Sequence, residues 1–330
     1  DPKIRGKFEK KWHTKLNPEV GLTTMEMVDA AEQGVIKGYM IMGENPMMSE
    51  PDLQHARHVM KDLDFVLVQD IFMNETAEYA DIIFPASSFA EKDGTFTNSD
   101  RRVQLIRKAI DAPGKARDDW RILSDLALRV EDRLGVSESA GFVFDSPSEI
   151  WEEMASLTPL FQGISHERIR RESGVHWPCE TEDHPGTPYL FSKTFPKGKG
   201  TLTPLDFKPS SELPDDEYPF LLSTGRVLYH WHGGTMTRRS KLDDIYPEPT
   251  VEVNPKDAKK LNIQAGDWIT VRSRRGAIKV KTLVSKRSQS GVVFIPFHFS
   301  EAAANELTLD VRDPKAKIPD YKVCAVTLEA

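Results

Sequence analysis

Small and polar residues follow two apolar runs in the first third of the chain. Gly43 and Asn45 come directly after one run, and Gln69 and Asp70 come at the end of another. Glycine permits a ligand to approach the backbone closely, and the two amide side chains each carry a hydrogen-bond donor and an acceptor. These residues suit the polar edge of a ligand such as a nucleobase. The structural alternative is that the first pair forms a turn and that Asp70 caps the next one.

An aspartate pair opens an amphipathic segment that continues to Leu134. Asp118 and Asp119 precede apolar residues at helical spacing. A carboxylate accepts two hydrogen bonds side by side, and guanine presents such a pair of donors through its ring N–H and its exocyclic amine. Either aspartate could instead cap the helix, a role worth about 1 kcal/mol. The two roles are compatible if each aspartate takes one.

A candidate phosphate site lies in the last third of the chain. Thr224-Gly225-Arg226 ends an apolar run, and His230 and His232 follow within a glycine-containing segment. The Arg226 charge and the free backbone N–H groups near the glycines suit phosphate oxygens. The two histidines alternate, so they would share one face if the segment were a strand. A metal site needs a third ligand and none is nearby in sequence, so we expect no metal ligands here.

The bulk composition narrows the class of protein. The 330 residues allow two domains, and 39% hydrophobic with 29% charged residues is ordinary for a globular protein. The net charge of −7 argues against a nucleic-acid partner, and no stretch approaches the roughly 18 apolar residues of a membrane span. The two cysteines, Cys179 and Cys324, lie far apart, so this chain cannot by itself hold a four-cysteine iron–sulfur cluster. Scarce cysteines fit a reducing compartment, and we expect a cytoplasmic protein.

Residues 1–145 alternate short apolar runs with amphipathic segments, which favours an α/β fold with a doubly wound parallel sheet. Strands are expected at 39–42, 65–68 and 82–84, and helices at 51–62 and 118–134. Ser49 is expected to cap the first of these helices. The chain starts without a signal-like segment or an initiating Met, and we interpret it as part of a longer one.

The rest of the chain divides into a connector and a β region. Residues 146–215 are rich in Pro, Gly and charge, which predicts an extended linker with a small helix near 147–157. Residues 216–330 carry β-branched runs separated by turns, with a helix at 255–261 capped by Asn254. Strands are expected at 220–223, 250–253, 268–273, 277–284, 292–296 and 323–328. Six short strands with one helix indicate a small six-stranded β-barrel.

Three longer motifs connect these features. They are QDIFMNETAEYADIIFPASSFAEKDGTFTNSDRRVQ, TGRVLYHWHGGTMTRR and PDYKVCAV. Together they resemble the molybdopterin oxidoreductase superfamily, and most closely the C-terminal half of the catalytic (alpha) subunit of formate dehydrogenases. The resemblance runs across nearly the whole chain. It implies that residues 1–145 form part of an α/β molybdopterin guanine dinucleotide-binding domain and that residues 216–330 form the β-barrel molybdopterin dinucleotide-binding domain.

The resemblance also implies a bis(molybdopterin guanine dinucleotide) cofactor with molybdenum or tungsten. Positions similar to one guanosine site are Asn45, Ser49, Gln69, Ala86 and Asp119, beside Gly43 and Asp70. Positions similar to the pterin and phosphate contacts are Arg226, His230, Trp231, His232, Thr235, Asn305, Tyr321 and Lys322, beside Thr224. Close relatives carry Asp in place of Asn45 and a hydroxyl residue in place of Ala86, so the particular hydrogen bonds of these two positions are left open.

The family's iron–sulfur, metal-ligand and formate-binding motifs are absent from this sequence, so no catalytic residue is expected in it. The resemblance places a 4Fe–4S cluster in an N-terminal half that would be its partner, together with iron–sulfur or flavin electron-transfer subunits. The implied reaction is the reversible oxidation of formate to carbon dioxide, with electrons passing through iron–sulfur clusters to NAD. Alternatives are a nitrate reductase or arsenite oxidase of the same superfamily, or a metal-free subunit like the large subunit of respiratory NADH dehydrogenase. Asp119 and the histidine-containing motif argue against the metal-free alternative.

Overall fold

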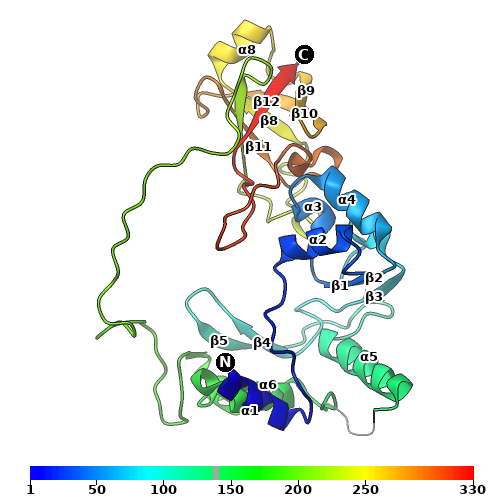
Figure 1. Cartoon of the computed structure of the whole chain (residues 1–330), viewed down its shortest axis with the longest axis vertical. Helices are drawn as coiled ribbons and strands as arrows, with labels where there is room; N and C mark the ends of the chain where they lie inside the picture. Colours follow the sequence, from blue (N-terminus) through cyan, green and yellow to red (C-terminus); the bar gives the residue numbers. More distant parts are fainter. Residues whose placement is uncertain (137–140) are drawn as a thin grey trace. The chain divides into compact units, whose positions relative to one another are not determined.

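The computed structural model describes residues 1–136 and 141–330, and the chain divides into two compact units (Figure 1). The first unit comprises residues 1–20 and 84–205, and the second comprises residues 21–83 and 206–330. This division differs from the predicted domain limits at 145 and 215, which remain a prediction, and residues 137–140 of the predicted first domain lie outside the described residues. Within the described part of the chain, no helix combines the length and the apolar character that a membrane crossing needs.

A parallel sheet carries the first part of the second unit. Strands β1 (Gly38–Met42) and β2 (Phe65–Asp70) pair in parallel, and β3 (Ile82–Pro85) follows β2 in the sheet. Helices α3 (Pro46–Ser49) and α4 (Leu53–Asp62) form the crossover that two parallel neighbours require. The predicted parallel sheet is confirmed.

The helices around this sheet begin at positions that the sequence analysis partly missed. Helix α4 starts after Asp52, whose side chain accepts a hydrogen bond from the His55 backbone N–H at 3.4 Å. The predicted cap at Ser49 is wrong, because Ser49 is the last residue of α3. Helix α2 (Thr24–Glu32) was not predicted, although Thr23 and Glu26 form a capping box at its start.

The second part of the second unit is a closed barrel of six strands, as predicted. Its strands are β7 (Phe220–Gly225), β8 (Thr250–Val253), β9 (Trp268–Arg272), β10 (Ala277–Val284), β11 (Val292–Pro296) and β12 (Cys324–Glu329). Around the barrel they run in the order β10-β8-β11-β7-β12-β9. Helix α8 (Pro255–Leu261) follows Asn254, whose side chain caps it by accepting from the Lys256 backbone N–H at 2.9 Å.

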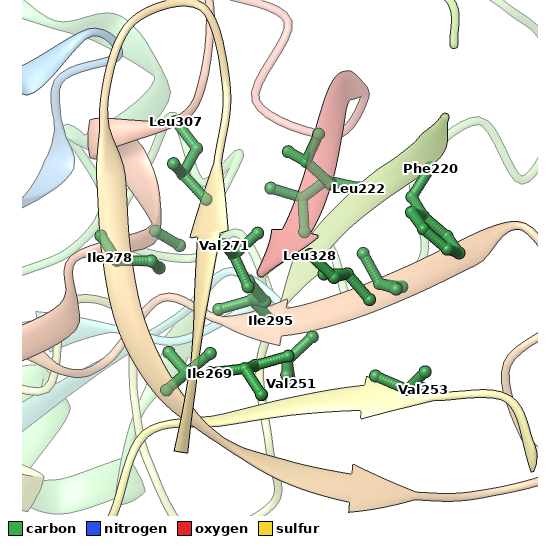
Figure 2. Packing of buried hydrophobic residues seen from close by; sticks show 14 of the residues in the cluster. Phe220, Leu222, Val251, Val253, Ile269, Val271, Ile278, Ile295, Leu307 and Leu328 are labelled. Carbon is green, nitrogen blue, oxygen red and sulfur yellow. The ribbon is translucent and has the colours of Figure 1, made fainter. Parts of the chain in front are cut away.

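Alternating apolar residues fill the barrel interior. Leu222, Val271 and Ile295 come from three different strands and are completely buried. Figure 2 shows these side chains pointing toward a common centre. The period of two residues along each strand is what allows one face to be apolar while the other faces outward. This core makes the barrel a rigid support for the loops at its ends.

The pairing of β7 with β11 decides which loops lie together. These strands are parallel, with Gly225 opposite Pro296 at their carboxyl ends. The chain therefore leaves both strands at the same edge of the barrel. The segments that follow Gly225 and Pro296 carry most of the residues predicted from the barrel side.

The first unit is built around a small antiparallel sheet of order β4-β5-β6. Its elements are α1 (Pro2–Lys11), β4 (Gly94–Thr97), β5 (Arg102–Ile106), α5 (Asp119–Leu134), α6 (Pro147–Leu157), α7 (His166–Glu172) and β6 (Val175–His176). Helix α6 confirms the small helix that was predicted at those residues. Helix α7 and β6 give the predicted linker more regular structure than expected. The β4–β5 hairpin was not predicted, because its strands are only four and five residues long.

Candidate functional site

The second unit contains a pocket of about 240 Å³ at the barrel edge just described. It is lined by Met48, Ser49, His232, Gly233, Phe297, Asn305, Tyr321 and Lys322. Five of these residues were predicted as cofactor contacts, and the backbone around Gly233 was predicted to suit phosphate oxygens, whereas Met48 and Phe297 were not predicted. An isolated methionine or phenylalanine in a sequence is interpreted as core, so no local signal could have identified these two.

Two cations beside this pocket have no acidic partner. Lys322 Nζ donates to the Thr224 carbonyl oxygen at 3.3 Å and lies 5.2 Å from the centre of the Phe297 ring. The Arg226 guanidinium lies 5.1 Å from the centre of the Trp231 ring, which is 61% exposed. Across residues 1–136 and 141–330, no carboxylate forms an ion pair with Arg226 or Lys322. Burial and then the Arg226 charge lower the pKa of Lys322, which indicates a position where an anion would be favourable.

Asn305 attaches the barrel to the end of helix α3. The last carbonyl groups of a helix have no partner within it. Asn305 is only 6% exposed, and its Nδ2 donates to the carbonyl oxygens of Met48 and Ser49, each at 3.1 Å. This contact fixes one wall of the pocket.

Tyr321 lies on the other side and is held through its backbone. The buried Thr224 hydroxyl donates to the Tyr321 carbonyl oxygen, which ties the segment before β12 to the end of β7. Burial raises the pKa of the Tyr321 hydroxyl, and Glu50 and Asp310 act in the same direction. The tyrosine therefore stays protonated and can donate a hydrogen bond into the pocket.

Asn45 has a structural role in this unit. Its Oδ1 accepts from the Thr76 hydroxyl at 2.8 Å and from the Thr76 backbone N–H at 3.2 Å. Its Nδ2 donates to Glu75 Oε2 at 2.7 Å and to Thr235 Oγ1 at 3.1 Å. The amide therefore links helix α3 to the loop that follows β7, and both of its polar atoms are engaged.

The predicted residues after β1 and β2 also take the structural roles named as alternatives. Gly43 has φ +63° and donates its N–H to the Gln69 carbonyl oxygen at 2.9 Å, while the Gln69 side chain is completely buried. Asp70 accepts from the Phe72 backbone N–H and from Asn74 Nδ2, each at 3.0 Å, so it caps the turn after β2. Their cofactor contacts remain a prediction.

His230 and His232 do not share a face, because the segment between β7 and the short helix at Thr237–Arg239 is a loop. His230 is buried, with Nε2 2.7 Å from the Tyr246 carbonyl oxygen and Nδ1 3.2 Å from Thr237 Oγ1. His232 is exposed. No cluster of three His, Cys, Asp or Glu side chains suited to a metal ion occurs in the part of the chain that the structure describes.

His298 was given no role from its sequence position, yet it contacts the same loop twice. It is 1% exposed. Its Nε2 lies 3.0 Å from the Val227 backbone nitrogen, and its Nδ1 contacts the His232 carbonyl oxygen. Burial lowers its pKa to about 4, against an opposing contribution from the His232 carbonyl. Only the parallel pairing of β7 with β11 brings these residues together.

Ala86 and Asp119 belong to the first unit and are described there. Ala86 is buried and forms an isolated bridge with Arg117. Asp119 forms an ion pair with Lys92, a partner that the sequence did not indicate. Asp118 occupies the N-cap position of α5, but its carboxylate accepts from the Ser87 hydroxyl at 3.2 Å rather than from a backbone N–H. The alternative that one of the two aspartates caps this helix therefore holds for the position of Asp118, although its side chain makes no capping hydrogen bond.

Comparison with known families and proteins gives matches over most of the chain. Residues 9–129 match a family described as molybdopterin oxidoreductase, and residues 220–325 match one described as molydopterin dinucleotide binding domain. The alpha subunit of an F420-dependent formate dehydrogenase from Methanocaldococcus jannaschii is 47% identical over 325 residues, which cover 98% of this chain and 47% of that protein. The assimilatory nitrate reductase catalytic subunit from Bacillus subtilis is 36% identical over 336 residues, which cover 98% of this chain and 46% of that protein.

The chain spans about half the length of the curated relatives it matches. Among solved structures, acetylene hydratase from Pelobacter acetylenicus is similar with a TM-score of 0.69 and 18% sequence identity. That match covers 99% of this chain and 49% of the acetylene hydratase chain. At this identity the likeness concerns the fold alone.

Proposed function

Since the chain belongs to the molybdopterin oxidoreductase family, we propose that it is the cofactor-binding part of a formate dehydrogenase. The observation that carries this proposal is the pair of cations, Arg226 and Lys322, at a pocket where neither has an acidic partner among the described residues. Both residues lie within the segment that matches the dinucleotide-binding family. A dinucleotide supplies the phosphate anions that such a pair of cations attracts.

The residues at this pocket fit a molybdopterin dinucleotide. Arg226 and Lys322 would bind its phosphate oxygens by charge, and Tyr321 and Ser49 would offer hydroxyl donors to its polar edges. Asp119 lies in the first unit and is proposed independently of this pocket: its carboxylate, which also pairs with Lys92, would accept the two donors of a guanine. When bound, the cofactor supplies two-electron chemistry at its molybdenum or tungsten. This chain's own contribution is to bind and orient, and apolar neighbours such as Met48 and Phe297 limit the access of water.

The proposed reaction is the reversible oxidation of formate to carbon dioxide. It rests on the formate dehydrogenase relative, and it requires the other half of the length that the relatives have. That half would hold the 4Fe–4S cluster and the metal ligand, and further iron–sulfur or flavin subunits would carry the electrons onward. We place F420 ahead of the NAD that the sequence suggested as final acceptor, because F420 appears in the name of this relative. The cytoplasmic location stays a proposal that rests on the scarcity of cysteines.

Nitrate reduction is the second candidate, favoured by the relative that is 36% identical. Residues at the cofactor pocket discriminate poorly between these two reactions, because they would contact the cofactor and not the substrate. The choice therefore depends on an assay of the whole protein.

The test uses the complete protein, purified anaerobically together with its partner chains. Molybdenum and tungsten are measured by mass spectrometry and pterin by the fluorescence of its oxidised form. Formate is then supplied with F420 or with NAD, and nitrate with a reduced dye. We expect metal, pterin and formate-dependent reduction of F420. Protein without pterin would overturn the proposal, and nitrate reduction without formate oxidation would replace it by the second candidate.

A further inference from the structure

His298 joins the two ends of the loop that borders the pocket. The loop leaves β7 after Gly225, and His298 follows β11, so the parallel register of Gly225 with Pro296 places them at one barrel edge. His298 Nε2 meets the backbone nitrogen of Val227, and Nδ1 meets the carbonyl oxygen of His232. One buried ring therefore spans a loop segment that runs from the residue after Arg226 to a residue that lines the pocket.

These two contacts fix the protonation state of the ring. The Val227 backbone N–H is a donor, so His298 Nε2 must present a lone pair. The His232 carbonyl is an acceptor, so His298 Nδ1 must carry the hydrogen. The ring is therefore neutral, with its proton on Nδ1. A second proton on Nε2 would face the Val227 N–H and break that contact.

The surroundings of the ring favour the same state. The His230 ring lies 5.4 Å away, and the charges of Arg226 and Arg238 oppose protonation of His298. Phe299 and Phe297 are the other aromatic neighbours of the ring.

The loop is also closely packed on the backbone of His298. A Cβ at Gly234 would lie 2.5 Å from the His298 carbonyl oxygen, and Gly234 has φ +79°. Both observations require glycine there. The loop therefore cannot move away from His298 at one contact without disturbing the others.

We propose that His298 is a positioning residue, which holds Arg226 and the His232–Gly233 wall in the arrangement that receives an anionic ligand. This inference deepens the proposed function and takes the identity of the ligand, a phosphate-bearing dinucleotide, from it. His298 itself does not line the pocket, and it acts through the loop.

Three variants of His298 remove its contacts with Val227 and His232 separately or together. In His298→Asn the side-chain amide reaches the place of Nδ1 and keeps a donor toward His232. In His298→Gln the amide oxygen reaches the place of Nε2 and keeps an acceptor for Val227. His298→Phe keeps the ring volume and loses both. The matched control is His58→Phe, because His58 is an exposed histidine of α4.

The readouts are pterin per chain after salt washes, hydrogen exchange of the Val227 amide, and binding of inorganic pyrophosphate to cofactor-depleted complex. We expect His298→Phe to weaken retention about tenfold or more, since each hydrogen bond contributes a few-fold. His298→Asn and His298→Gln should lie between it and the wild type, which is a rescue that simple core damage would not give. The ring ¹⁵N shifts of wild-type His298 should report a proton on Nδ1 and none on Nε2.

The inference is overturned if His298→Phe keeps pterin, pyrophosphate binding and Val227 protection at wild-type levels. It is equally overturned if barrel amides far from the loop lose protection together with Val227, because the role would then be general stability. If His298→Phe does not fold, equal loss of retention and equal loss of protection in His298→Asn and His298→Gln would overturn it. Wild-type protein without pterin would contradict only the proposed function. Pyrophosphate binding and amide exchange would still test the role of His298.

Discussion

The barrel side of the pocket and the loops after β1 and β2 were both predicted to bind the cofactor. Their polar groups, however, differ in whether they have partners on the protein. Arg226 and Lys322 carry charges that no carboxylate neutralises within the described residues. Asn45 and Asp70, in contrast, have hydrogen-bond partners on the protein for each of their polar atoms. A polar group that the chain already satisfies has a structural role. Arg226 and Lys322 are exposed, and two neighbouring cations without an acidic partner among the described residues favour an anionic ligand. Substitutions should therefore separate loss of binding from loss of stability.

The largest effect is expected for Arg226→Ala combined with Lys322→Ala. Each charged hydrogen bond to phosphate contributes about 1.5–3 kcal/mol, so the double variant should retain the pterin at least about 100-fold less tightly. The free energy of unfolding of the cofactor-free protein should change little, because neither cation has an ion pair to lose. Pterin content after dilution and urea unfolding measure the two quantities. Lys241→Ala is the control, since the Lys241 side chain is 99% exposed. Equal pterin retention in both proteins would contradict the ligand role.

Glu50 tests the distinction between satisfied polar groups and ligand-binding charges, because it belongs to neither group. Its side chain is 7% exposed, and among the described residues its Oε2 has no hydrogen-bond partner. Burial raises its pKa to about 7, with Asp310 and Glu44 acting in the same direction. Between the ordinary value of 4.5 and pH 7 the folded state binds the extra proton, so the free energy of unfolding falls as the pH rises.

We therefore expect Glu50→Gln to stabilise the protein above pH 7 by up to about 3 kcal/mol and to have little effect near pH 4.5. Urea unfolding at pH 5 and pH 8 measures this difference. Glu217→Gln is the control, because Glu217 is an exposed glutamate of the same unit. A stabilisation of the same size at both pH values would mean that the charge on Glu50 is not its cause.

Asn45→Ala should show the reverse of the cation double variant. The substitution removes the acceptor of the Thr76 hydroxyl proton and one donor to the Glu75 carboxylate, so we expect a loss of about 2 kcal/mol of stability. Pterin retention should fall only as far as stability does. Thermal unfolding of the cofactor-free protein, with pterin content at a temperature well below the transition, separates the two. A strong loss of pterin at full stability would give Asn45 a direct contact with the cofactor.

The barrel could be predicted almost completely from the sequence. All six strands were found to within two residues at each end, since period-two alternation and turn residues are local signals. Arg226 was also a candidate on its local motif, whereas Lys322 was a candidate only through the resemblance to the family. Their shared lack of acidic neighbours could not be predicted, because it depends on which segments the barrel brings together.

The contacts that complete the pocket could not be predicted from local sequence patterns. Asn305 reaches the carbonyl groups of Met48 and Ser49 across more than 250 residues, and His298 reaches Val227 through a strand pairing. The hairpin of β4 and β5 was missed because its strands are only four and five residues long, although β5 alternates between polar and apolar residues from Arg102 to Leu105. Short strands depend for their stability on the strands that pair with them, and a single sequence does not indicate which strands these are.

The smallest effect on stability is expected for Asp119→Asn. This substitution extends the comparison of structural and ligand-binding polar groups to the first unit. Asp119 forms an ion pair with Lys92, and both side chains are partly exposed, so losing the pair should cost at most about 1 kcal/mol. Asn offers one acceptor and one donor where guanine presents two donors, so a guanine contact would be weakened beyond this small loss. Lys92→Met removes the same ion pair and keeps the carboxylate of Asp119. If Asp119 binds guanine, pterin retention should fall in Asp119→Asn and hold in Lys92→Met, whereas a purely structural aspartate would give the same small change in both.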